Sequence, residues 1–180
     1  LSLAKESTHG LLLISGPVGT GKSYLIRSIL TELNERRAVV CSPPTEFLFQ
    51  AGKLTQVAAN FGKSIIVLED IGEIVAIDAA SKYEDARANL LNFSEGLLSL
   101  LVDGIIIVSF NYSIEKIDPA ILRPGRCLAH IKIGNLSYER AKSLVSFEIP
   151  ESSYSLAEIY EMKRTEKIIS SKEDKVGLTR

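Results

Sequence analysis

The chain has 180 residues, enough for one domain with a sizeable hydrophobic core, or for one domain with a small appendage. Hydrophobic residues make up 46% and charged residues 24%, as in ordinary globular proteins. The formal net charge of −1 argues against a protein that binds nucleic acid through bulk charge alone.

The sequence shows no sign of a membrane span or a signal peptide. Apolar runs such as Leu11–Ile14 and Ile105–Val108 have strand length, whereas a span needs roughly 18 apolar residues. The two cysteines, Cys41 and Cys127, lie in apolar runs without CxxC spacing, so we expect reduced core residues and a soluble, reducing, cytoplasmic setting. Because the sequence begins with Leu1 rather than Met, we expect it to be part of a longer protein.

Five short apolar runs predict the strands of a sheet. The first four lack polar alternation, as expected for strands buried on both faces of a parallel sheet, and the fifth is weaker. The runs are Leu11–Ser15, Ala38–Cys41, Ile65–Leu68, Ile105–Ser109 and Leu128–Ile133.

Helix-length segments separate these runs. Apolar side chains at helical spacing predict helices at Ser23–Glu35, Leu54–Phe61 and Ala86–Leu101. Strands that alternate with helices predict an α/β, doubly wound fold with a mostly parallel five-stranded sheet.

The pattern becomes wholly helical after the fifth run. Ser137 predicts a helix start, and Tyr154–Lys163 predicts a further helix. We therefore expect a core domain, a small helical annex and a charged tail that is frayed or flexible, over residues 1–134, 135–164 and 165–180.

The run Gly16-Pro-Val-Gly-Thr-Gly-Lys22-Ser23 matches the P-loop pattern G-x-x-x-x-G-K-[ST] in full. Its glycines let the backbone point consecutive N–H groups at phosphate oxygens, and the following helix adds its positive end. Lys22 reaches the β- and γ-phosphates, and the Ser23 hydroxyl can ligate Mg²⁺. A glycine-rich turn without a ligand is the alternative, but the strand before and the helix after favour ATP. The expected phosphate-site residues are Gly16, Pro17, Val18, Gly19, Thr20, Gly21, Lys22, Ser23 and Tyr24.

Two acids, Glu69 and Asp70, directly follow the third apolar run. The carboxyl end of a strand in an open α/β sheet faces the ligand crevice. One carboxylate can hold the Mg²⁺ shell while the other accepts a proton from the attacking water. The alternative is that the acids only begin a solvated loop.

These motifs, with two later runs, resemble the AAA+ ATPase family of P-loop NTPases over residues 8–147. Ile105–Asn111 resembles the core strand that ends in a sensor asparagine, and Ile117–Arg126 resembles the second region of homology. The resemblance implies that Asn111 helps to place the attacking water. It also implies that Arg123 and Arg126 project towards the γ-phosphate held by a neighbouring subunit. The alternative is that these two arginines form salt bridges at a turn.

A site shared between subunits implies a ring, most often a hexamer. The annex resembles a shortened lid, in which Ser155–Ala157 offers no third arginine.

The family order of the acids is Asp then Glu. Here the order is reversed, so by position Glu69 would bind Mg²⁺ together with Ser23, and Asp70 would activate the attacking water. Because Asp is shorter than Glu, slow turnover is an alternative. This order and Leu90–Gly96 resemble the Bcs-type branch, which includes a mitochondrial translocase and bacterial relatives.

The resemblance favours a ring-forming, ATP-driven remodeller of proteins, such as a chaperone, unfoldase or translocase. Phe47 and Phe49 lie where relatives carry a pore loop, but they fit a hydrophobic core equally, and Ile71–Arg87 fits a second pore loop or a solvated connection. A nucleic-acid-associated loader and a slow or non-hydrolysing scaffold are the alternatives. The expected partners are ATP, copies of this chain and a protein substrate rather than a nucleic acid, with no membrane segment.

Overall fold

The computed structural model describes residues 7–40, 48–79, 81–95 and 102–177. These residues form two compact units. The first contains the described residues up to Gly16 and from Lys22 to Lys132, and the second contains residues 17–21 and the described residues from Ile133 onward. Within these ranges, no helix is both long and apolar enough to cross a membrane.

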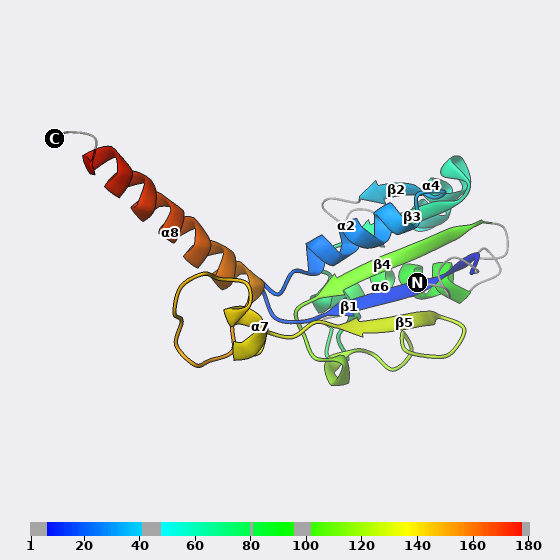
Figure 1. Ribbon diagram of the computed structural model, residues 1–180. Coiled ribbons are helices and arrows are strands. Elements are labelled where there is room, and N and C mark those ends of the chain that lie inside the picture. The colour runs from blue at the N-terminus through cyan, green and yellow to red at the C-terminus, as the bar shows by residue number, and fades with distance from the viewer. Residues whose placement is uncertain (1–6, 41–47, 80, 96–101, 178–180) are drawn as a thin grey trace. The chain divides into compact units, whose positions relative to one another are not determined.

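The described part of the first unit contains a five-stranded sheet in which all neighbouring strands are parallel, in the order β2-β3-β4-β1-β5 (Figure 1). This arrangement confirms the predicted α/β fold of a P-loop NTPase. The strands are β1 (His9–Ser15), β2 (Arg37–Val40), β3 (Ser64–Leu68), β4 (Gly104–Phe110) and β5 (Cys127–Lys132).

Burial separates the middle of the sheet from its edge at β2. All residues of β3 and β4 are buried, which explains their unbroken apolar sequences. Strand β2 lies at the edge and is mostly exposed, with Val40 63% exposed. The expectation that all of the first four strands are buried on both faces is therefore wrong for β2, because this strand pairs on one side only and its side chains are left uncovered.

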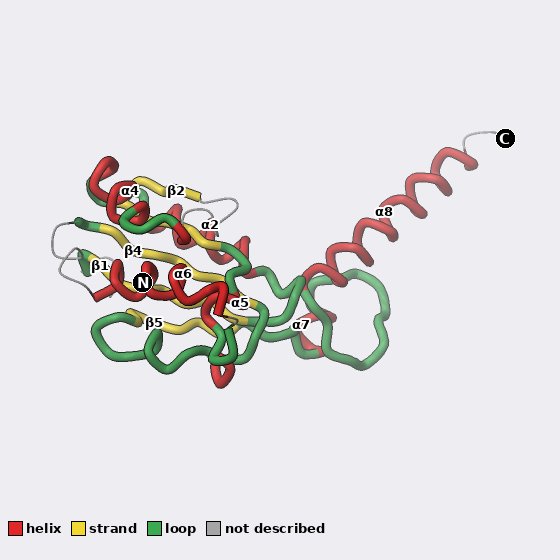
Figure 2. The backbone as a smooth tube through the Cα atoms, turned by 180° about the vertical axis from the view of Figure 1, so that it is seen from behind, coloured by secondary structure: helices red, strands yellow, loops and turns green. Residues whose placement is uncertain are grey.

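Helices lie on both faces of the sheet. Helix α2 (Lys22–Glu32) lies in front of it in Figure 1, and α6 (Glu84–Glu95) lies in front in the reverse view of Figure 2. Helix α4 (Lys53–Phe61) and the short α5 (Gly72–Val75) share one hydrophobic cluster with α6. The sheet contributes alternate residues to this cluster, including Leu11, Leu13, Ile66, Leu68, Ile106 and Val108.

The second unit has its own small core. Helix α7 (Tyr138–Lys142) begins at Ser137, whose hydroxyl accepts the backbone N–H of Arg140, so the predicted helix start is confirmed. The core residues are Ala141, Ile149, Tyr154 and Ile159. The division of the chain into an ATPase core and a lid stays a prediction.

Helix α8 (Leu156–Gly177) is longer than expected. The sequence predicted a helix that ends at Lys163 and a tail from residue 165, but the described helix continues to Gly177. The reason is that residues 164–176 contain neither Gly nor Pro and are rich in Glu and Lys, which favour a helix. Helix α6 is described only to Glu95, and residues 96–101 of its predicted extent lie outside the described residues.

Candidate functional site

Lys22 begins α2 and lies beside the end of β1. Its Nζ donates a hydrogen bond to the carbonyl oxygen of Gly16 at 2.9 Å, and its side chain is buried. Burial lowers the pKa of Lys22, while the carboxylates of Asp70 and Glu69 act in the opposite direction. The lysine of the glycine loop and the two predicted acids are therefore close enough to interact electrostatically.

Ser23 and Glu69 supply two oxygen atoms from neighbouring elements. The Ser23 hydroxyl donates to Glu69 Oε2 at 3.3 Å, although 46 positions separate the two residues. Hydroxyl and carboxylate oxygens are suitable ligands for Mg²⁺, which usually keeps further oxygen ligands from phosphate and water. Among the described residues, no group of three or more His, Cys, Asp or Glu side chains is arranged to hold a metal. The pair thus fits Mg²⁺ that arrives with a phosphate ligand, rather than a metal site built by protein alone.

Asp70 has an unusual backbone conformation, with a φ of 56°. Asp enters this left-handed region at a lower cost than most residues because its short polar side chain can bond locally. Its N–H donates to Ser109 Oγ at 3.2 Å, and its Oδ1 accepts a hydrogen bond from Asn111 Nδ2 at 3.2 Å. The end of β4 therefore holds both the backbone and the carboxylate of Asp70.

Ser109 is a positioning residue that the sequence analysis missed. It is 3% exposed, and its carbonyl also accepts the N–H of Ile71 at 3.2 Å. A single serine in an apolar strand gives no signal of a partner 39 positions away. Only the pairing of β3 with β4 brings the two residues together.

A cavity of about 280 Å³ opens beside Asp70. Its lining includes Asp70, Asn111, Glu73, Tyr83 and Tyr112. A water molecule occupies about 30 Å³ of liquid volume, so the cavity has room for several waters. The predicted water-activating acid and the predicted sensor asparagine therefore face the same solvent-accessible space.

The tip of the glycine loop, Pro17–Gly21, contacts the start of α8 within the second unit. The Ala157 N–H donates to the carbonyl of Gly19 at 2.9 Å, which satisfies one N–H of the first turn of α8. Gly19 has a φ of 79°, and a Cβ there would lie 3.1 Å from the Cβ of Ala157. The backbone conformation therefore favours glycine at this position, and the close approach of Ala157 adds to the cost of any side chain.

The remaining loop residues differ in exposure. Val18 is 77% exposed and Tyr24 is 65% exposed, with the Arg27 guanidinium 5.6 Å from the centre of the Tyr24 ring. Pro17 is also exposed, whereas Thr20 is buried and its hydroxyl donates to the Pro17 carbonyl at 2.8 Å.

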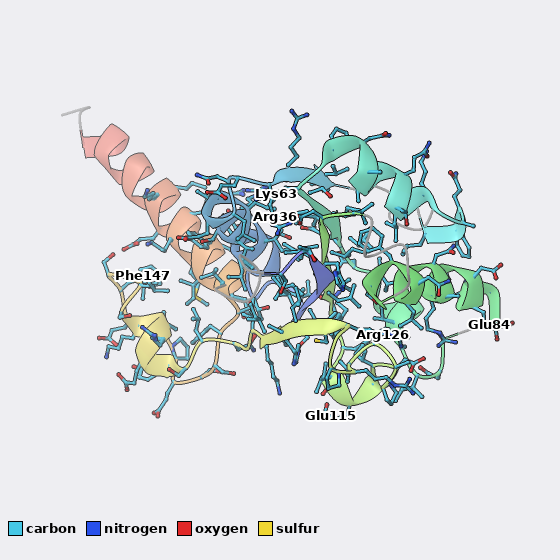
Figure 3. The ribbon with its side chains drawn as sticks, turned by 90° about the vertical axis from the view of Figure 1, so that its right-hand side faces the viewer. Arg36, Lys63, Glu84, Glu115, Arg126 and Phe147 are labelled. Carbon is cyan, nitrogen blue, oxygen red and sulfur yellow. The ribbon has the colours of Figure 1, made fainter. Side chains whose placement is uncertain are left out.

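The two predicted arginines have different surroundings. Arg123 is exposed, whereas Arg126 is partly buried and its Nη1 donates to the carbonyl of Ala120 at 2.9 Å. Figure 3 shows Arg126 beside the beginning of β5. The backbone carbonyl of Arg126 also accepts the N–H of Leu11 on β1 at 2.7 Å. Arg126 therefore supports its own loop, while Arg123 is the one exposed at the surface of the chain.

Phe49, from the predicted pore loop, is 43% exposed and stacks on Tyr83 with 6.1 Å between ring centroids. The Tyr83 hydroxyl donates to Glu73 Oε2 at 2.8 Å. Phe47 lies outside the described residues, as does Cys41. Phe49 is thus not a core residue, and its contact with a polypeptide stays a prediction.

Comparison with known proteins agrees with this arrangement. Residues 12–135 match the AAA family, described as "ATPase family associated with various cellular activities". Three Arabidopsis thaliana proteins are similar: AAA-ATPase At5g17760 (31% identical over 148 residues), AAA-ATPase At2g18190 (35% over 139) and AAA-ATPase At2g18193 (36% over 136). The aligned parts cover 74%, 70% and 70% of this chain, but only 28%, 27% and 26% of those proteins. The chain belongs to the AAA ATPase family.

Proposed function

We propose that this chain binds ATP together with Mg²⁺ at the glycine loop and hydrolyses it. The observation that carries the proposal is the convergence of polar side chains from the first turn of α2 and the ends of β3 and β4: Ser23 lies 3.3 Å from Glu69, and Asn111 lies 3.2 Å from Asp70. The buried Lys22 lies at the same edge. A lysine, a hydroxyl, two acids and an amide can together bind the phosphates, hold Mg²⁺ and position the attacking water for phosphoryl transfer.

Each group has a distinct proposed role. Lys22 exchanges its bond to the Gly16 carbonyl for the β- and γ-phosphates, and Ser23 and Glu69 hold Mg²⁺, which neutralises charge on the phosphates when bound. Asp70 accepts the proton of a water that enters from the adjoining cavity. Asn111, bonded to Asp70, orients the acid and the water together.

We further propose a ring of subunits, most often a hexamer, in which Arg123 of one subunit reaches the γ-phosphate of the next. Its exposure supports this role, whereas Arg126 is bound to its own loop through the Ala120 carbonyl. An arginine supplied in this way is worth about 10³–10⁵ in rate. We also propose a protein substrate: Phe49, which is 43% exposed and stacks on Tyr83, offers an aromatic surface for contact with a polypeptide.

ATP binding and phosphate release test the proposal. Titration with a fluorescent ATP analogue should show binding by the wild-type chain that Lys22→Ala weakens by roughly 10–150-fold, the equivalent of hydrogen bonds to a charged group. Lys63→Ala, a change at an exposed lysine of the same unit, serves as the control and should bind normally. Equal affinity of Lys22→Ala and wild type would contradict the phosphate site.

Mixed subunits test the shared site. Arg123→Ala should bind ATP normally but release phosphate slowly, and adding Lys22→Ala protein, which still carries Arg123, should raise phosphate release above the sum of the two. Absence of this rescue at every mixing ratio would argue against an arginine supplied from a neighbour. Wild-type protein that binds ATP but never releases phosphate would instead favour the nucleotide-dependent scaffold.

A further inference from the structure

Ser15, the last residue of β1, contacts a histidine of the neighbouring strand. Ser15 Oγ lies 2.7 Å from His130 Nε2, although the two residues are 115 positions apart. Ser15 is 2% exposed and directly precedes Gly16, where the glycine loop begins. A buried hydroxyl without a hydrogen-bond partner destabilises the folded protein. In the described structure, His130 is the partner of the Ser15 hydroxyl.

The His130 ring also stacks on the ring of Phe110, which belongs to the strand on the other side of β1. The rings of Phe110 and His130 are nearly parallel, at 9°, with centroids 6.4 Å apart. Phe110 belongs to β4 and His130 to β5, and β1 runs between these strands. Phe110 is the register partner of Ser15 and His130 that of Leu13, so the two rings belong to residues that flank the last three residues of β1. The imidazole is therefore held by packing as well as by its hydrogen bond.

Gly16 links this arrangement to the phosphate motif. Its N–H donates to the carbonyl of Phe110 at 3.3 Å, and its own carbonyl accepts the hydrogen bond from Lys22 at 2.9 Å. Any shift of the end of β1 therefore moves the group to which Lys22 is bonded. Strand β4 fixes this point through Phe110, and β5 fixes it through His130.

We propose that His130 is a positioning residue for the phosphate site: it holds Ser15, and thereby Gly16 and Lys22, in the geometry that receives a triphosphate. The inference rests on the proposed ATP site. A loop that is ordered before its ligand arrives binds more tightly than one that must be ordered by the ligand. Loss of the Ser15–His130 bond should thus weaken ATP binding.

Two amide substitutions separate this role from simple packing. In His130→Gln the terminal amide can occupy the position of Nε2 and keep the bond to Ser15. In His130→Asn the amide ends near the position of Nδ1 and is too short to reach it. Both variants remove the aromatic ring and any charge, so a difference between them reports the hydrogen bond.

The test is the affinity for a fluorescent ATP analogue, measured beside the thermal midpoint of unfolding. We expect His130→Asn to bind about fivefold more weakly than His130→Gln, the fold-change equivalent to one net hydrogen bond. Ser15→Ala removes the same bond without touching the stack of Phe110 on His130, and should show a similar loss. If His130→Asn does not fold, the comparison of Ser15→Ala with wild type decides.

The outcomes are distinguishable. Equal affinity of His130→Asn and His130→Gln, or wild-type affinity of Ser15→Ala, overturns the positioning role even if both variants unfold at lower temperature. Wild-type protein that binds no ATP contradicts the proposed ATP site itself. The proposal is supported if Ser15→Ala binds ATP more weakly than wild type and if the double variant with His130→Asn shows no further loss of affinity. Both changes then break the same Ser15–His130 contact.

Discussion

The division of labour between the two acids gives the sharpest prediction. Asp70→Asn should leave ATP binding within about twofold of wild type but lower the rate of phosphate release by about 10²–10⁴, the usual contribution of a general base. The substitution should leave the backbone undisturbed, because Asn, like Asp, tolerates the φ of 56° at this position. The side chain of Asn can still bond to Asn111 but cannot accept the proton of water.

Glu69→Gln is the informative partner variant. Glu69 contacts the Ser23 hydroxyl at 3.3 Å, on the proposed metal side, so its loss should raise the Mg²⁺ concentration needed for half-maximal turnover. Asp78→Asn changes an exposed acid of the same unit and should be neutral.

The assay is steady-state phosphate release over a series of Mg²⁺ concentrations, with binding of the fluorescent analogue measured in parallel. A rate loss of 10²–10⁴ corresponds to about 3–5 kcal/mol in the activation free energy, far outside the error of such an assay. The assignment is refuted if Glu69→Gln alone abolishes turnover at saturating Mg²⁺ while Asp70→Asn hydrolyses ATP normally.

Three further predictions concern stability and reactivity. Gly104→Ala should destabilise the fold by about 1–3 kcal/mol in urea unfolding, because its Cβ would lie 2.8 Å from Cζ of the buried Phe93, whereas Gly134→Ala, with nothing within 4 Å, should be neutral. Burial lowers the pKa of His130, so the unfolded chain binds the proton more tightly and stability should fall as the pH drops below about 6.5; His130→Gln should flatten this dependence. Burial raises the pKa of Cys127, so alkylation at pH 8, followed by mass spectrometry, should be slow until the chain is denatured.

Much of the fold was predictable because its signals are local. Strands β3 and β4 are buried along their whole length and so appear as unbroken apolar runs. Edge strand β2 has a similar apolar sequence but is mostly exposed, and the length of an apolar run carries no information about its place in the sheet. The end of α8 was missed for the opposite reason, since charged residues with good helix propensity look like a solvated tail.

The site was predictable where the motif is contiguous or follows a strand. Glu69 and Asn111 each follow a parallel strand, and such strands end at one edge of the sheet, so the contacts of Glu69 with Ser23 and of Asn111 with Asp70 follow from the fold class. The supporting contacts of Ser109 and His130 depend on which strands are neighbours. Sequence order alone does not contain this information, because β1 pairs with β4 and β5 and not with β2.

The same neighbour relation connects the two halves of the proposed intersubunit site. Strand β5 is fixed to β1 at its beginning, where the Arg126 carbonyl accepts the Leu11 N–H at 2.7 Å, and towards its end, where His130 contacts Ser15 at 2.7 Å. Arg123 lies in the loop that precedes this strand, and Gly16 follows Ser15 directly. In the proposed ring, a displacement of this strand pair would therefore act on both Gly16 and the intersubunit arginine, Arg123. Strands β1 and β5 are also paired along their length, from Leu11 with Cys127 to Ser15 with Lys132, so this pair links the proposed phosphate site to Arg123 within the first unit.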